Sequence, residues 1–236
     1  MKKKLLNALL LCLTASLLSG CLYPEENRTQ NQVPYKDQLL TVQTAVEQFQ
    51  KAEGGILPIK TRDESTPIYR KYPIDFKKIV PQYTAEIPGN AFENGGIFQY
   101  VLIDVEENPT VKLFDLRMAE KIREIKIRIK AQGYPPFKEE ISKNVYTLNY
   151  KEIGYKEEPY VMSPYTNNNL PLLISGDGNI YVDYRPDLFQ KIKEENLKPE
   201  QGEDIRNILV KDSEFVPAYS LPITVNKNNE PVFLMK

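Results

Sequence analysis

Apolar residues recur at helical spacing in two long segments of the chain. In residues 35–53 they fall at Leu39, Val42, Val46 and Phe49, and two glycines follow directly. This spacing predicts a helix with one apolar face. A second helix is predicted over residues 115–132, although alternating isoleucines leave a strand over 124–130 as an alternative. Shorter helices are predicted over residues 76–80, 186–195 and 203–210.

Three pairs of apolar segments flank turn-forming residues and predict β-hairpins. The first pair is 97–105 with 111–114, joined through Glu107-Asn108-Pro109. The second is 172–175 with 180–184 around the turn of residues 176–179, and the third is 223–225 with 232–235. Helices and hairpins together predict an α+β fold.

The order of these elements repeats along the chain. A helix is followed by a stretch with Gly and Pro, a Tyr/Pro-rich segment and a hairpin that leads into the next helix. We therefore predict two related units of amphipathic helix plus β-hairpin or meander, over residues 35–114 and 115–185. Residues 186–236 supply C-terminal helices and a hairpin as a partial third unit. Chance similarity of helix and hairpin signals is the alternative to duplication.

The first 34 residues follow a different pattern. Three lysines precede an apolar run over residues 5–18, which is shorter than the roughly 20 residues of a membrane span and is typical of a signal peptide over 1–20. Leu18, Ser19, Gly20 and Cys21 then resemble the lipobox of bacterial lipoproteins. The resemblance implies that Cys21 is lipidated and becomes the N-terminus, with the polar residues 21–34 as a tether. An ordinary signal peptide with an incidental cysteine is the alternative.

The cysteine content and the net charge limit the expected cellular location and the expected classes of binding partner. Cys12 and Cys21 are the two cysteines of the chain, so the part after Cys21 has no disulfide. Removal of residues 1–20 takes away three of the 31 basic residues, and the remaining 28 basic and 32 acidic residues give a formal charge of −4. We expect a lipid-anchored protein on the extracytoplasmic face of the cell membrane. Nucleic acid and anionic headgroups are not expected partners.

The chain contains no histidine, which removes most catalytic chemistry from consideration. Histidine-based triads, His-ligated zinc and an imidazole switch are excluded, and no serine after Cys21 has a lysine three residues later. A carboxylate-based glycosidase among Asp104, Glu106, Asp177 and Asp183 is a remote alternative. Residues 176–179 and Asp183 offer oxygen atoms for calcium, but a hairpin turn explains the same pattern. We predict no enzyme activity, no cofactor and no metal site.

Tyrosines provide the candidate contact surface. The chain has 15 tyrosines and no tryptophan, and many tyrosines stand beside prolines. Tyrosine combines apolar area with a polar tip and is enriched at interfaces. Packing over the edges of small sheets is the alternative role. The candidate contact residues are Tyr69, Tyr72, Tyr83, Tyr134, Tyr160 and Tyr165.

Two further resemblances extend this interpretation. The first unit, with AVEQFQKAEGGILPIK and GIFQYVLI, resembles the globular half of pseudopilins and type IV pilins, but it lacks their prepilin-peptidase site. The whole chain, with SGCLYP, VPYKDQLLTVQTAVEQFQ and GGILPIKT, resembles YphF-like lipoproteins of Gram-positive spore-forming bacteria. That resemblance implies a cellular location but no catalytic activity. We expect a non-enzymatic envelope lipoprotein that contacts another protein, with a small-molecule or cell-wall-glycan binding module as the alternative.

Overall fold

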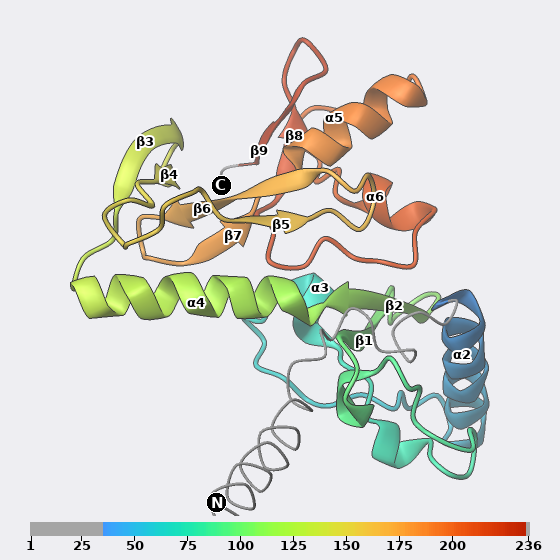
Figure 1. Cartoon of the computed structure of the whole chain (residues 1–236). Coiled ribbons are helices and arrows are strands. Elements are labelled where there is room, and N and C mark those ends of the chain that lie inside the picture. The colour runs from blue at the N-terminus through green and yellow to red at the C-terminus, as the bar shows by residue number, and fades with distance from the viewer. Residues whose placement is uncertain (1–34, 235–236) are drawn as a thin grey trace, which may run out of the picture.

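The computed structural model describes residues 35–234, in which helices and antiparallel strands form an α+β fold. The predicted signal peptide, the lipobox with Cys21 and the tether lie outside the described residues. Figure 1 shows two halves stacked on either side of the long helix α4. The N-terminal half lies below α4 in that view, and the C-terminal half lies above it.

The N-terminal half is a helix packed on a β-hairpin. Helix α2 spans Tyr35–Ala52, and strands β1 (Phe98–Ile103) and β2 (Thr110–Asp115) pair in register from Phe98 with Asp115 to Ile103 with Thr110. Between α2 and β1 lie the short helices α3 (Ile68–Lys71), η4 (Phe76–Lys78) and η5 (Phe92–Asn94). The predicted apolar face of α2 is buried here, together with residues of the hairpin and of the connecting segment. The core includes Leu39, Val42, Val46, Phe49, Ile74, Phe76, Ile79, Phe98, Tyr100, Leu102 and Leu113.

Helix α4 spans Leu116–Gln132 and connects the halves. The side chain of Asp115 accepts a hydrogen bond from the backbone N–H of Arg117 and caps the helix, which ends at Gly133 with φ of 96°. The alternative of a strand over residues 124–130 is therefore wrong. The buried face of α4, with Met118, Ile122 and Ile125, belongs to the core of the C-terminal half.

The C-terminal half contains a five-stranded sheet. Strands β3 (Phe137–Ser142), β4 (Val145–Leu148), β6 (Asn169–Ser175) and β5 (Tyr160–Met162) lie in that order, and β7 (Ile180–Val182) pairs with β6. The β6–β7 hairpin confirms the second predicted hairpin. The sequence did not predict β3, β4 and β5. The reason is that β3 is exposed over most of its length, and β4 and β5 are only four and three residues long.

The last 50 residues complete the same core. Helices α5 (Arg185–Glu194) and α6 (Asn207–Lys211) precede the hairpin of β8 (Ile223–Val225) and β9 (Pro231–Phe233). Apolar residues of all four elements join one cluster with α4 and the five-stranded sheet. The predicted C-terminal helices and hairpin are thus present, and they share the core of the second predicted unit.

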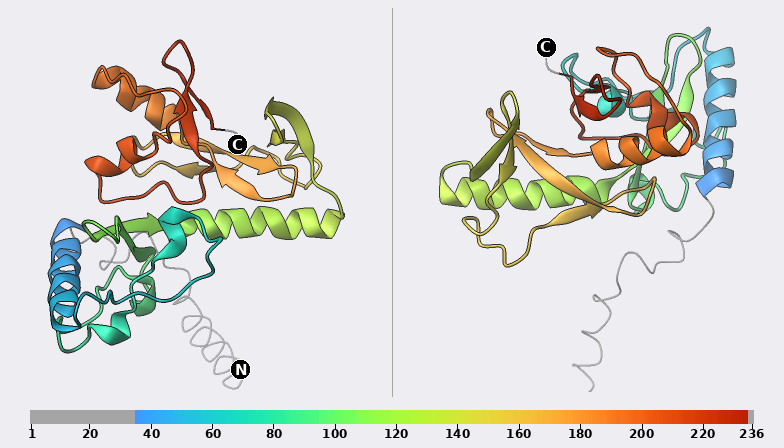
Figure 2. Two further views of the ribbon diagram at one scale, coloured as in Figure 1. Left: turned by 180° about the vertical axis from the view of Figure 1, so that it is seen from behind. Right: turned by 90° about the horizontal axis from the view of Figure 1, so that it is seen from above.

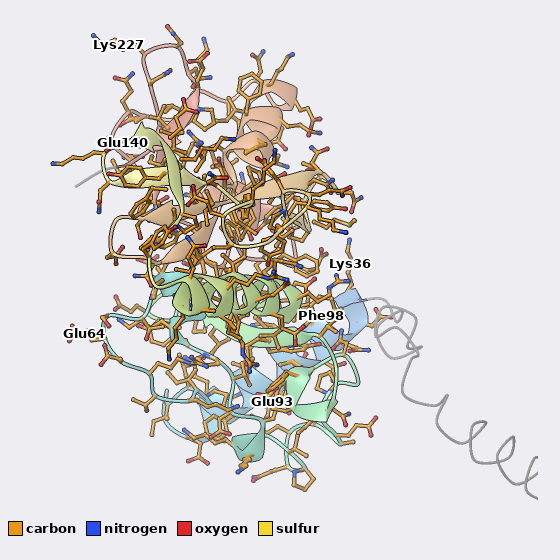
Figure 3. The ribbon with its side chains drawn as sticks, turned by 60° about the vertical axis from the view of Figure 1, so that its left-hand side comes forward. Lys36, Glu64, Glu93, Phe98, Glu140 and Lys227 are labelled. Atoms are coloured by element: carbon orange, nitrogen blue, oxygen red, sulfur yellow. The ribbon has the colours of Figure 1, made fainter. Side chains whose placement is uncertain are left out.

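A smaller apolar cluster joins the two halves. Val101, Ile103 and Phe114 of the β1–β2 hairpin pack on side chains contributed by residues 210–218. The backbone N–H of Leu113 donates to the carbonyl of Glu214 at 2.8 Å, so residues 213–216 extend the hairpin. Figure 2 shows the halves meeting along the N-terminal part of α4. In Figure 3, Glu64 and Glu93 lie in the lower half, whereas Glu140 and Lys227 lie in the upper half.

Candidate functional site

The short helix α3 lies where the two halves meet. It follows Pro67, and the segment after it hydrogen bonds to β1, with the N–H of Leu102 donating to the carbonyl of Tyr72 at 2.8 Å. This pairing holds α3 against the hairpin while its first residue, Ile68, projects to solvent with 54% of its surface exposed. Ile68 is therefore an apolar residue of which more than half remains exposed at the joint.

Two adjoining hollows open on either side of Ile68, and we call them together the junction groove. The first, about 540 Å³, is lined by α3, Tyr72 and the β1–β2 turn. The second, about 560 Å³, is lined by α3, the hairpin and α6 of the other half. Ile68, Ile103 and Asp104 border both hollows. The groove therefore runs across the joint and takes its walls from both halves.

Two reciprocal cation–π contacts hold α3 to the C-terminal half. The guanidinium of Arg70 lies 4.2 Å from the centre of the Tyr219 ring, and that of Arg206 lies 5.1 Å from the centre of the Tyr69 ring. Tyr219 also packs edge-on against Phe114. Each half thus supplies one arginine and one tyrosine, so the contacts form only when the halves are docked.

Lys112 at the α6 end of the groove is hydrogen bonded within the protein, whereas Lys211, which lines the same hollow, is exposed. The Lys112 ammonium donates to the carbonyls of Val210 and Ser213, at 3.0 and 2.5 Å. Burial lowers the pKa of Lys112, although the carboxylates of Glu214, Asp104 and Asp212 act to raise it. Lys112 therefore ties the hairpin to the segment after α6.

Asp204 and Arg206 form the second polar tie at this end. The Arg206 guanidinium donates to both carboxylate oxygens of Asp204 and to the carbonyl of Ser220. Burial acts to raise the pKa of Asp204, but the hydrogen bonds and charge of Arg206 outweigh it and hold that pKa below its ordinary value. Burial raises the pKa of Tyr69 to about 12, against the opposing charge of Arg206. The Tyr69 side chain that lines the groove is consequently uncharged at physiological pH.

The other end of the groove is acidic. Asp104, Glu106 and Glu107 follow β1 in its turn and line the first hollow. Asp104 has φ of 50°, a left-handed conformation that aspartate tolerates better than most residues. None of these three carboxylates forms an ion pair with any residue in the described range 35–234. This end of the groove thus presents negative charge to solvent.

The six candidate tyrosines do not share one surface. Tyr69 and Tyr72 border the junction groove, where both are half-buried. Tyr83 packs edge-on against Phe49 in the N-terminal core, and Tyr165 packs edge-on against the buried Tyr184. Tyr134 and Tyr160 are exposed, after α4 and on β5 respectively. The first two are therefore the candidate tyrosines that belong to the groove.

The acidic candidates divide between the two halves. Asp104 and Glu106 line the groove, whereas Asp177 accepts hydrogen bonds from Ser175 and Asn179 within the β6–β7 turn. Asp183 pairs with the Arg185 guanidinium at 2.7 Å. Within residues 35–234 no group of three or more acidic residues, histidines or cysteines is arranged to hold a metal ion. The turn at 176–179 is accounted for by these internal bonds.

Sequence patterns did not identify the residues that join the halves. Ile68 and Arg70 stand in a segment without helical or alternating periodicity, and Arg206 lies in the predicted helix over residues 203–210, whose pattern does not reveal a contact with the other half. One signal was present in the sequence: Asp-x-Arg occurs at residues 115–117, 183–185 and 204–206. In each copy the aspartate accepts from the backbone N–H and the guanidinium of the arginine two residues later. The third copy places Arg206 at the joint.

Comparison with known proteins identifies the N-terminal half. Residues 35–115 match the model of the YphF family N-terminal domain, so this part of the chain is similar to that domain. The matched range includes α3, Ile68 and the acidic turn of the junction groove. No curated protein and no solved structure matches the chain. No helix among residues 35–234 is long and apolar enough to cross a membrane.

Proposed function

We propose that the protein is a membrane-anchored extracytoplasmic lipoprotein, without enzymatic activity, that binds another envelope protein through the junction groove. The observation that supports binding is the junction groove, which crosses the joint and has the exposed Ile68 between its two hollows. Exposed apolar residues within a hollow bordered by polar groups are typical of protein contact sites.

The shape of the groove favours a protein over a small molecule. Small-molecule sites enclose most of their ligand in a mainly apolar cavity. The junction groove is instead open along its length, and tyrosines contribute only Tyr69 and Tyr72 to it. A row of exposed tyrosines would favour a glycan-binding module. The candidate tyrosines are instead spread over both halves.

Anchoring rests on the N-terminal sequence. The apolar run over residues 5–18 and the lipobox ending in Cys21 support a diacylglyceryl anchor, and two acyl chains hold a protein on a bilayer where one does not. Residues 22–34 would span at most about 45 Å when extended. The groove would then be presented close to the outer surface of the membrane.

A single set of variants in the producing cells tests both parts of the proposal. The wild-type chain should fractionate with membranes and give one crosslinked adduct of discrete mass, whereas Cys21→Ser should leave the membrane fraction. Ile68→Asp should remain in the membrane but lose at least 90% of the adduct. Ile56→Asp is the matched control, because Ile56 is 61% exposed and lines neither hollow. Equal adducts from both isoleucine variants would refute the groove as the binding site.

A further inference from the structure

We infer that the partner segment held by the junction groove carries an apolar side chain next to a lysine or an arginine. The inference rests on the proposed function, since it specifies the chemistry of a partner bound at that site. The exposed Ile68 stands at the centre of the groove above the largely buried Ile103, and Asp104 borders both hollows beside them. An apolar group placed on the two isoleucines therefore has a carboxylate within reach.

Unbalanced charge indicates the sign of the neighbouring residue. The carboxylates of Asp104, Glu106 and Glu107 form no ion pair within residues 35–234. Lys71, the cation of the same hollow, places its ammonium 5.6 Å from the centre of the Tyr72 ring. A lysine or arginine of a partner would supply the missing positive charge, and its aliphatic stem would cover apolar surface.

The opposite end of the groove is not acidic, because Lys112 and the exposed Lys211 line it. Lys112 donates to two backbone carbonyls there, and Asp204 is paired with Arg206. The negative charge of the groove that has no ion pair therefore lies at the β1–β2 turn, whereas Lys211 adds a positive charge at the α6 end. An acidic lipid surface and a nucleic acid would both be repelled by that turn, which leaves a basic protein segment as the occupant.

Selection from a phage-displayed library of random dodecapeptides tests this inference. The target is the full-length chain in detergent micelles, with bare micelles as background. We expect enriched peptides in which an apolar residue adjoins Lys or Arg. Synthetic versions should bind the wild type at least tenfold more tightly than a Glu106→Lys/Glu107→Lys variant. They should bind a Glu53→Lys/Glu86→Lys control, with the same change of charge away from the groove, within twofold of the wild type.

The alternative results separate this inference from the proposed function. Peptides that lack the apolar–basic pair but lose binding on Ile68→Asp would overturn the partner chemistry and leave the groove as a binding site. Peptides whose binding withstands both Ile68→Asp and the charge reversal would overturn both proposals. A library that yields nothing above bare micelles would also count against both. Circular dichroism of each exposed-site variant shows that a loss of binding is not a loss of folding.

Discussion

At the scale of single residues, a buried polar pair organises the N-terminal core. The Tyr100 hydroxyl donates to the side-chain carbonyl of Asn90 at 2.7 Å, and both residues are fully buried. The backbone of Asn90 lies against Gly96, because the N–H of Phe98 donates to its carbonyl and draws the two segments together. Close backbone approach of this kind requires a residue without a Cβ atom.

Gly96→Ala should therefore be far more damaging than the same change one residue earlier. A Cβ atom at position 96 would stand 2.1 Å from the carbonyl carbon of Asn90, and backbone cannot yield as a flexible side chain does. A Cβ atom at position 95 would meet no atom within 4 Å, and the left-handed backbone alone costs about 1–2 kcal/mol. Urea unfolding should show that Gly96→Ala loses roughly 2 kcal/mol more than Gly95→Ala. Equal losses would contradict the close packing.

Asp187 is a fully buried acid of the C-terminal half. Its carboxylate accepts hydrogen bonds from Thr166 Oγ1 at 2.6 Å and Ser163 Oγ at 2.8 Å, which fasten the loop after β5 to the start of α5. Burial raises the pKa of Asp187 above its ordinary value, although the two hydroxyls act to lower it. The ionised form is therefore less stable in the folded state than in the unfolded chain.

The pH dependence of stability should reveal this group. Because its folded pKa is raised, the contribution of Asp187 is complete below the unfolded pKa of about 4 and is lost as pH rises through the folded pKa. Asp187→Asn does not titrate. The free energy of unfolding of the wild type, measured relative to this variant, should therefore fall as the pH rises from about 4 through the raised folded pKa. A difference that stays constant or grows over this range would be inconsistent with a raised pKa.

Sequence reasoning succeeded unevenly at this scale. Leu39, Val42, Val46 and Phe49 were expected on one helical face and are all buried, since apolar periodicity reports directly on burial. The roles of the tyrosines could not be separated in advance, because tyrosine suits both a core edge and an interface. Only tertiary contacts distinguish Tyr83, packed on Phe49, from the exposed Tyr134.

At the scale of elements, the helices and hairpins with strong periodicity were predictable and the joint between them was not. Both long helices, α2 and α4, and all three hairpins lie close to the expected residues. Helix α3 has four residues, too few for any periodic signal, and its position depends on pairing with β1. The junction groove could not be predicted from local pattern for the same reason.

Two short segments, one in each half, have the same arrangement of buried residues around a turn, and the duplication of the units stays a prediction. Ile74, Phe76 and Ile79 are buried around a turn in which the N–H of Lys78 donates to the carbonyl of Asp75. Leu148, Tyr150 and Ile153 are buried around a turn in which Glu152 donates to Asn149 in the same way. An Asp-x-Arg sequence follows both the β1–β2 and the β6–β7 hairpin. Where the C-terminal half pairs β3 with β4, the described part of the N-terminal half has an isolated antiparallel bridge between Ile59 and Ile74.

The contribution of α3 to the joint can be measured with a matched pair of arginines. Arg70 lies 4.2 Å from the ring centre of Tyr219 across the joint, and Arg128 lies 4.2 Å from that of Tyr155 within the C-terminal half. Each contact is worth about 0.5–2 kcal/mol. In calorimetry, Arg70→Ala should weaken the coupling of the two halves and separate their unfolding transitions. Arg128→Ala should instead lower the melting temperature of the C-terminal half. The same thermogram for both variants would argue against α3 as the link between the halves.

At the scale of the whole molecule, the protein consists of two apolar cores joined by a small third cluster and by polar ties at one end of α4. The binding surface that we propose arises only from this arrangement, because its walls come from α3 and the β1–β2 hairpin on one side and α6 on the other. Docking of the halves and binding of a partner are therefore coupled: a partner that fills the groove stabilises the docked state.

Site-specific photocrosslinking tests the central claim most directly. A photoreactive benzoylphenylalanine is placed at position 68 in one strain and at position 56 in another, and intact cells are irradiated. We predict one discrete protein adduct from position 68, retained on the membrane through Cys21, and none of that mass from position 56. The account would be contradicted if position 68 gave no adduct, or if both positions gave the same one.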